Sequence, residues 1–124
     1  MKLHLVLKSK WYNMIANGEK PEEYREFNTY WKKRLGTNKK DEAFKTNGLE
    51  CVLYGVRNED GSVEEFYLKN FESVVFHKGY SNETMEWTIR KAGIGIGEPR
   101  WGGENKSCFI IELNKRKDTK PYSI

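Results

Sequence analysis

Residues 3–25 read LHLVLKSKWYNMIANGEKPEEYR, and this opening segment carries the clearest structural pattern in the chain. The apolar run Leu3–Leu7 predicts a buried strand. Trp11, Met14 and Ile15 follow at the i, i+3 and i+4 spacing of one helix face, so they predict a short helix. The chain therefore begins with a strand followed closely by a helix.

The end of this segment predicts a turn and a second strand. Ser9 is placed to serve as the helix N-cap, and Gly18 as its left-handed stop. Residues 22–25 then read as a short strand. In an extended backbone Glu23 and Arg25 point to the same face, because side chains alternate along a strand.

The remaining elements are short and mostly extended. A polar stretch without clear periodicity, residues 36–48, predicts a mobile loop. We expect a helix over 30–35, a hairpin of strands 50–57 and 63–68 around a turn at 58–61, and further strands over 71–77, 85–96 and 108–113. This pattern predicts an α+β protein: a small, partly closed mixed β-barrel with two or three short helices.

Length and charge indicate one mildly basic domain. The 124 residues suffice for a single core, which we place at 1–114, with a basic, flexible tail at 115–124. The net charge is +4 at a sequence pI near 9.0. Residues 28–45 alone carry a balance of +4 and residues 114–124 one of +3. The basic charge is therefore concentrated in one internal segment and the tail.

Composition gives no reason to expect a membrane, a disulfide or a metal. No apolar run approaches the ~20 residues of a membrane-spanning helix, and the start of the chain lacks a signal-peptide core. Cys51 and Cys108 lie in apolar, strand-like runs; a disulfide is conceivable, but a reduced pair in a cytoplasmic protein is favoured. His4 and His77 lack further ligands at metal spacing, so we expect neither zinc nor any cofactor.

The densest group of chemically active residues is the segment 18–25. A carboxylate beside an arginine stays ionised, and a nearby lysine can contact a phosphate or act as a base if its pKa is lowered. Lys20, Glu23 and Arg25 are therefore the main candidate site residues. The structural alternative is a solvated turn with incidental salt bridges.

A second candidate surface follows at residues 30–34. Here Trp31 is followed by Lys32, Lys33 and Arg34, a combination of ring and cations that suits single-stranded nucleic acid. The alternative is a basic helix whose rings pack inward.

The glycine-rich segment near residue 100 allows two interpretations as well. Trp101 is either a stacking platform at a cleft or a plug of the core. Gly93, Gly95 and Gly97 lack the Lys-Ser/Thr ending of a phosphate loop and instead predict a bulged strand.

Residues 7–25 resemble the opening signature of the ASCH family: a strand, a short helix and then a Gly-x-Lys-x-x-Glu-x-Arg pattern. In this chain the pattern falls on Gly18, Lys20, Glu23 and Arg25. Two later stretches, 76–80 and 95–102, resemble the strand with its Gly-Tyr turn and the glycine-rich approach to the final strand. The resemblance spans most of the chain, with an apparent insertion between residues 35 and 71.

The resemblance implies a PUA-like barrel with a cleft that binds RNA or a related ligand. One branch of the family hydrolyses the acetyl amide of N-acetylated cytidine with a Lys, a Thr three residues later and a Glu from a later strand. Lys20 matches that Lys, but Glu23 occupies the Thr position. Other members are described as nucleases or as nucleic-acid-binding modules, so the fold alone does not select the function.

Two hypotheses follow, and a protein-interaction adaptor without a ligand is a third. In the first, the protein binds RNA, another nucleic acid or a nucleoside through Lys8, Lys20, Glu23, Tyr24, Arg25, Trp31, Lys32, Lys33, Arg34, Tyr80 and Trp101. In the second, it is a hydrolase of a modified nucleoside or a phosphodiester, with Lys20 activating water and Glu23 as acid or base.

Overall fold

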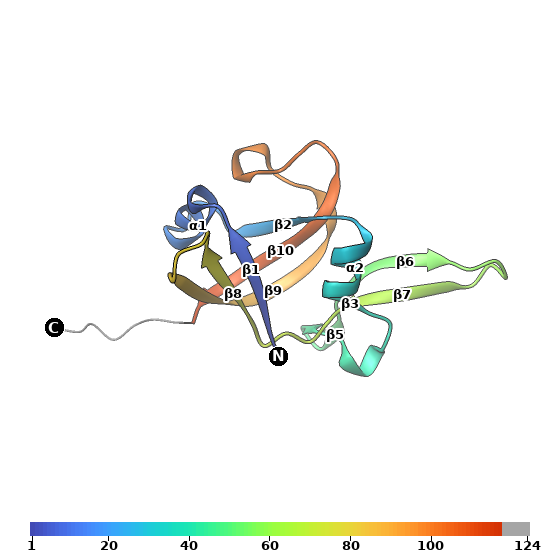
Figure 1. Cartoon of the computed structure of the whole chain (residues 1–124). Helices are drawn as coiled ribbons and strands as arrows, with labels where there is room; N and C mark the ends of the chain where they lie inside the picture. Colours follow the sequence, from blue (N-terminus) through green and yellow to red (C-terminus); the bar gives the residue numbers. More distant parts are fainter. Residues whose placement is uncertain (118–124) are drawn as a thin grey trace.

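A computed structural model of the protein describes residues 1–117. Its main sheet contains five strands in the order β1-β8-β9-β10-β2 (Figure 1). Its strands are β1 (Lys2–Leu7), β8 (Ser73–Lys78), β9 (Thr84–Ile96), β10 (Ser107–Arg116) and β2 (Glu22–Glu26). β1 runs parallel to β8, and the other three pairings are antiparallel. The sheet is therefore mixed, and the protein is α+β as expected.

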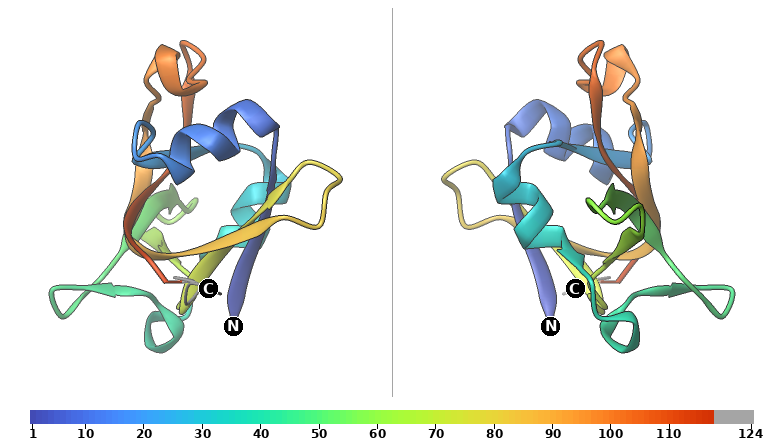
Figure 2. Two further views of the ribbon diagram at one scale, coloured as in Figure 1. Left: turned by 90° about the vertical axis from the view of Figure 1, so that its left-hand side faces the viewer. Right: turned by 90° about the vertical axis from the view of Figure 1, so that its right-hand side faces the viewer.

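The sheet is strongly curved but is not closed into a barrel (Figure 2). β1 and β2 are its two edge strands, and within the described chain they do not pair with each other. A seam therefore remains between the first two strands of the sequence. The side chains of the 18–25 segment lie at this seam, as described below.

Two α-helices flank the sheet: α1 (Ser9–Ala16) and α2 (Thr29–Leu35). α1 buries Tyr12 and Ile15 and ends at Asn17, after which Gly18 has the expected positive φ of +87°. The predicted capping by Ser9 is wrong, because Ser9 is already helical and Lys8 precedes it without a side-chain cap.

The segment between α2 and β8 forms a small second layer. β6 (Val52–Arg57) and β7 (Val63–Leu68) form the expected hairpin, which projects to one side of the molecule (Figure 1). The irregular loop predicted for residues 36–48 is wrong. That segment contains β3 (Gly36–Thr37), which pairs with β7, the 3₁₀ helix η1 (Lys40–Glu42), and β4 (Lys45–Thr46), which pairs with β5 (Leu49–Glu50).

The glycines of β9 are not at a bulge. Gly93 and Gly95 pair in regular register with β10, and the register shift lies closer to Lys91. After β9 the chain forms a second 3₁₀ helix, η2 (Pro99–Trp101), and then returns through β10. The bulge was expected at the wrong residues; of the three glycines, only Gly97 lies against an aromatic ring, that of Tyr24.

The core lies between the curved sheet, α1 and α2. Its fully buried side chains include Leu3, Leu5, Ile15, Leu35, Phe71, Phe76, Phe109 and Ile111. Each such side chain contributes roughly 1.5–3 kcal/mol of burial free energy. Cys51 and Cys108 are both buried and free.

The C-terminal boundary differs slightly from the prediction. Lys115 and Arg116 still belong to β10, and the backbone N–H of Lys117 donates to the carbonyl oxygen of Glu86 at 2.8 Å. The rest of the predicted tail, 118–124, lies outside the described residues. Among residues 1–117 there is no helix long and apolar enough to cross a membrane.

Candidate functional site

A buried carboxylate, Glu23, is the centre of the candidate site. Its side chain contacts two cations: Oε1 lies 3.2 Å from Nζ of Lys20, and Oε2 lies 2.8 Å from Nη2 of Arg25. Glu23 is only 6% exposed and Lys20 only 1%. Lys20 and Arg25 thus converge on one carboxylate, as the motif spacing predicts.

Local backbone structure explains this convergence. Gly18 turns the chain after α1, and the N–H of Lys20 donates to the carbonyl oxygen of Met14 at 3.1 Å. β2 then pairs with β10, where Glu23 lies opposite Ile111 and Arg25 lies opposite Phe109. The turn and the strand pairing therefore fix the backbone at both ends of the motif.

The two cations also connect separate parts of the fold. Nζ of Lys20 donates to the carbonyl oxygen of Trp101 at 2.6 Å, which anchors η2 beneath the site. Nη2 of Arg25 donates to the carbonyl oxygen of Val6 at 3.0 Å and so bridges the seam between β2 and β1. The guanidinium also lies 5.0 Å from the ring of Trp31, while its Nε is buried and has no hydrogen-bond partner among residues 1–117.

Burial dominates the electrostatics of Lys20. Desolvation lowers the pKa of its ammonium below 10.5, although Glu23 acts in the opposite direction. Burial likewise raises the pKa of the Tyr24 hydroxyl to about 12. That hydroxyl accepts a hydrogen bond from the N–H of Glu98 at 2.9 Å.

Aromatic rings surround the charged group. Nζ of Lys20 lies 4.3 Å from the ring centroid of Tyr24 and 5.6 Å from that of Trp11. Two glycines make room for these rings: a Cβ on Gly97 would approach the Tyr24 ring to 2.9 Å, and one on Gly102 would approach Trp11 to 3.1 Å. A larger residue at position 97 would therefore collide with the Tyr24 ring, and one at position 102 would crowd Trp11 and also strain a backbone at a φ of +94°.

Two adjoining cavities lie beside Tyr24 and Arg25. The first, here called the Glu23 cavity, measures about 250 Å³ and lies at the seam of the sheet. Its walls are formed by the end of β1 with Lys8, by Trp11 of α1, by Glu23, Tyr24 and Arg25 of β2, and by Trp101 and Gly102.

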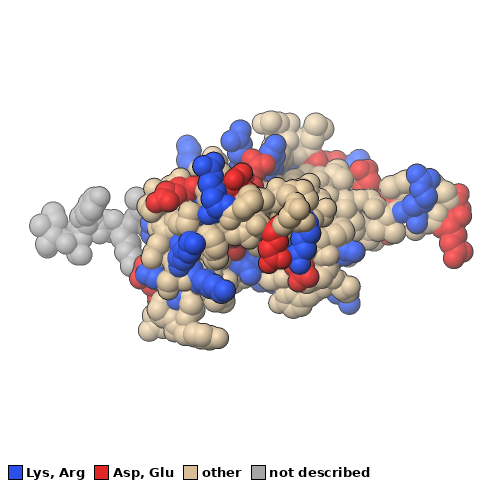
Figure 3. Space-filling view, turned by 90° about the horizontal axis from the view of Figure 1, so that it is seen from above, with Lys and Arg blue, Asp and Glu red and all other residues tan. Residues whose placement is uncertain are grey.

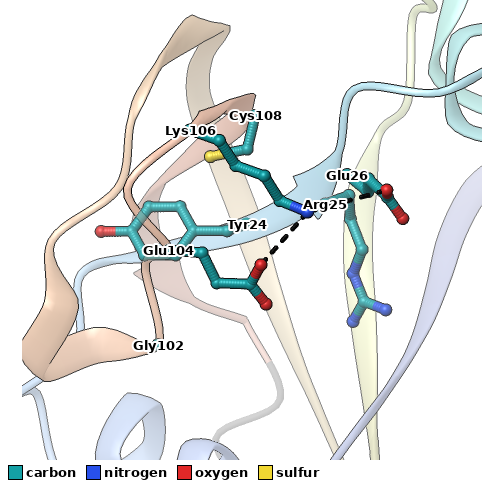
Figure 4. A pocket seen from close by; sticks show the side chains of 7 residues that line it. All are labelled: Tyr24, Arg25, Glu26, Gly102, Glu104, Lys106 and Cys108. Carbon is teal, nitrogen blue, oxygen red and sulfur yellow. Dashed lines mark ion pairs between the residues drawn. The ribbon is translucent and has the colours of Figure 1, made fainter.

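The second cavity measures about 140 Å³ and shares Tyr24, Arg25 and Gly102 with the first (Figure 4). Here Lys106 reaches across the mouth and forms ion pairs of 3.2 Å with Glu104 and 3.8 Å with Glu26 (Figure 4). This cation is already paired with two carboxylates. The second cavity is therefore a poor site for an anion.

The structure brings only part of the predicted residues together. Lys8, Glu23, Tyr24, Arg25 and Trp101 line the Glu23 cavity. Lys20 lies behind it, so the direct contact with a phosphate that we expected of Lys20 does not fit its burial. Tyr80 is fully exposed in the turn after β8 and lines neither cavity.

The cations of α2 face a different groove. Lys32 and Lys33 line a shallow cavity of about 310 Å³ together with Tyr54 and Phe66, whose rings stack at 4.9 Å. Arg34 is half-buried in the same helix turn. Lys32, Lys33 and Arg34, here called the α2 cations, do not line the Glu23 cavity. From the same helix, the ring of Trp31 contacts Arg25 of that cavity.

Trp11 and the two packing glycines were missed in the sequence. From periodicity, Trp11 is expected only on the apolar face of α1; Gly97 was expected at a bulge, and Gly102 only in the glycine-rich segment before the final strand. A tryptophan on a helix face directly before a charged turn, with several glycines elsewhere in the chain, only weakly indicates a binding site. Only the tertiary contact between Gly102 and Trp11 reveals their role.

The arrangement is a preformed polar group under aromatic walls, which suits a planar ligand with hydrogen-bond donors and acceptors. Among the residues described, no group of three or more His, Cys, Asp or Glu side chains is arranged to hold a metal ion. In comparisons with known proteins, no family model, no curated protein and no solved structure matches the chain.

Proposed function

We propose that the chain is a PUA-like ASCH domain that binds a nucleoside, free or as an unstacked base of RNA, in the Glu23 cavity. One observation carries the proposal: a buried carboxylate, held by Lys20 and Arg25, lies at the floor of a cavity with Trp11, Tyr24 and Trp101 around it. The order of strand, helix, glycine turn and strand supports the family assignment.

The chemistry of the cavity matches that of a nucleobase. Stacking of a base on an aromatic side chain is worth ~1–3 kcal/mol and suits any base. A carboxylate accepts hydrogen bonds from an exocyclic amine, and a guanidinium donates to ring nitrogens or carbonyl oxygens. Glu23 and Arg25 together therefore recognise a base edge that presents both a donor and acceptors.

Size and charge favour one nucleoside over a long polyanion. A cavity of about 250 Å³ lies just below the ~300–1,000 Å³ typical of drug-sized ligands. The face of the molecule in Figure 3 carries basic and acidic side chains intermixed rather than a continuous basic track. Lys8 at the rim is exposed and available to a phosphate.

Lys20 acts as a positioning residue in this proposal. Its ammonium contacts Glu23 from behind and the carbonyl oxygen of Trp101 from below. It thereby fixes the carboxylate and the η2 loop in one geometry before a ligand arrives. Such preorganisation lowers the entropic cost of binding.

A hydrolase is the second candidate, favoured by one observation. Burial lowers the pKa of Lys20, and a lysine needs a lowered pKa to act as a base. Its present contacts, however, are with Glu23 and a backbone carbonyl. Since Glu23 replaces the Thr of the acetyl-cytidine hydrolases, we expect little or no turnover of N-acetylated cytidine.

The test compares Glu23→Gln with Glu22→Gln by calorimetric titration with cytidine, adenosine and uridine. Glu22 is the matched control, because it is the adjacent carboxylate of β2 and lines neither cavity. We expect Glu23→Gln to weaken cytidine and adenosine binding about tenfold or more, the loss of one charge-assisted contact. Uridine lacks the exocyclic amine and should bind weakly to every variant.

Two outcomes would contradict the proposal. If Glu23→Gln and Glu22→Gln bound cytidine with equal affinity, Glu23 would not contact the base. Release of acetate from N-acetylated cytidine by the wild type, abolished by Lys20→Arg, would establish the hydrolase instead.

A further inference from the structure

A pair of histidines on the outer face of the main sheet lies outside the proposed nucleoside site. His4 of β1 and His77 of β8 are 73 positions apart in the sequence, but the parallel pairing of their strands makes them neighbours. His4 lies opposite Val75 and His77 lies opposite Val6, so the two rings are diagonal neighbours on one face. Neither histidine lines a cavity of the candidate site.

The two rings present nitrogen atoms to each other at hydrogen-bond distance. Nδ1 of His4 lies 2.9 Å from Nε2 of His77, and the ring centroids are 5.2 Å apart. His4 is exposed and His77 half-buried, so the pair is open to solvent. The nearby ammonium of Lys2 is already paired with Glu86 at 3.1 Å, which reduces its repulsion of a second cation.

The two nitrogens are close enough to become neighbouring ligands of one metal ion once the rings turn, because a centroid distance of 5.2 Å is that of rings aligned nitrogen to nitrogen in a hydrogen bond. Metal–imidazole bonds measure about 2.0–2.1 Å, so two such bonds at a right angle separate the nitrogens by ~2.9 Å. Tetragonal Cu²⁺ offers such right angles, and imidazole is a good ligand for it. The strand pairing holds the two backbones side by side, so binding requires only a rotation of the two side chains.

We propose that His4 and His77 form a binding site for a borderline divalent transition-metal ion, occupied most tightly by Cu²⁺. The two neutral imidazoles supply adjacent equatorial ligands, and solvent supplies the others. Both nitrogens must offer lone pairs, so the proton that one of them donates in the hydrogen bond moves to the other nitrogen of the same ring, and both imidazoles stay neutral. The tightness for Cu²⁺ follows from the general order of divalent-metal affinities.

The test is a Cu²⁺ titration of the full chain, followed by electron paramagnetic resonance and calorimetry. The chain contains only two histidines, so the double variant His4→Gln/His77→Gln has no imidazole left. We expect one tight equivalent in the wild type, with two imidazole nitrogens in the spectrum, and a loss of affinity of about tenfold or more in either single variant. Thr84→Ala is the matched control, because Thr84 pairs with His77 without offering a nitrogen.

Two results would overturn the proposal. One is equal Cu²⁺ affinity in the wild type and the double variant. The other is an affinity that His4→Gln lowers but His77→Gln leaves unchanged, which would place the metal on the N-terminal amine and His4. Should His77→Gln fail to fold in the presence of a chelator, the spectrum of the wild type decides: two imidazole nitrogens support the site, and one overturns it.

Discussion

Replacing Lys20 by Met should destabilise the protein by about 3 kcal/mol. The substitution keeps the apolar stem but removes the ammonium from a pair in which Lys20 is 1% and Glu23 6% exposed. Removing one partner of a buried ion pair typically costs ~3–5 kcal/mol, because the remaining charge is left uncompensated. Glu23 retains Arg25 at 2.8 Å, so the cost falls at the lower end of that range.

The assay is urea unfolding followed by tryptophan fluorescence. With a slope of ~2 kcal/mol/M, a loss of 3 kcal/mol lowers the midpoint by about 1.5 M. The same substitution made in a Glu23→Gln background should cost at least ~0.5 kcal/mol less, since contacting groups are energetically coupled. A loss below ~0.5 kcal/mol, or equal losses in both backgrounds, would refute the view that Lys20 holds the carboxylate in place.

Three further predictions concern Lys20, Gly97 and the α2 cations. Burial lowers the pKa of Lys20 below 10.5, so between its pKa in the folded protein and 10.5 the unfolded chain binds more protons than the folded one. The free energy of unfolding of the wild type, compared with that of Lys20→Met, should therefore rise with pH in this interval. A difference between the two proteins that stays constant across the interval would contradict the lowered pKa. Gly97→Ala should lower the free energy of unfolding by ~1–3 kcal/mol and weaken nucleoside binding, because its Cβ would collide with Tyr24. Gly93→Ala is the control: its Cβ meets no atom within 4 Å, so this variant should bind the nucleoside normally. Equal stability and equal affinity of the two variants would contradict the packing role of Gly97. Changing the α2 cations to Gln should weaken RNA binding and flatten its salt dependence while leaving cytidine affinity unchanged, and a loss of cytidine affinity would link the groove to the Glu23 cavity.

Local pattern was sufficient for much of the fold. The apolar run of β1, the helix spacing of α1 and the hairpin turn each depend on near neighbours in sequence, and all three appear where expected. The convergence of Glu23 and Arg25 also follows from strand alternation alone. β3 was missed because its distant partner β7 imposes it, whereas β4 and β5 form a local hairpin around Asn47 and Gly48, both at positive φ, a signal that the sequence contains and that was overlooked.

The site was predictable only where its residues are close in sequence. The burial of Lys20 depends on the carbonyl oxygen of Trp101, 81 positions away. The space beside Trp11 depends on Gly102, and the contact of His4 with His77 depends on parallel strand pairing. Such contacts arise from tertiary structure, and no local propensity encodes them.

The most direct test of the proposed function is an NMR titration of ¹⁵N-labelled protein with cytidine. The chain has four tryptophans, whose indole N–H resonances report separately on different parts of the fold. Binding in the Glu23 cavity predicts that the signals of Trp11 and Trp101 shift with a common affinity while that of Trp87, which lines neither cavity, stays in place. Shifts confined to α2 and the Tyr54 groove, or no shift of the Trp11 and Trp101 signals at millimolar cytidine, would contradict the proposal.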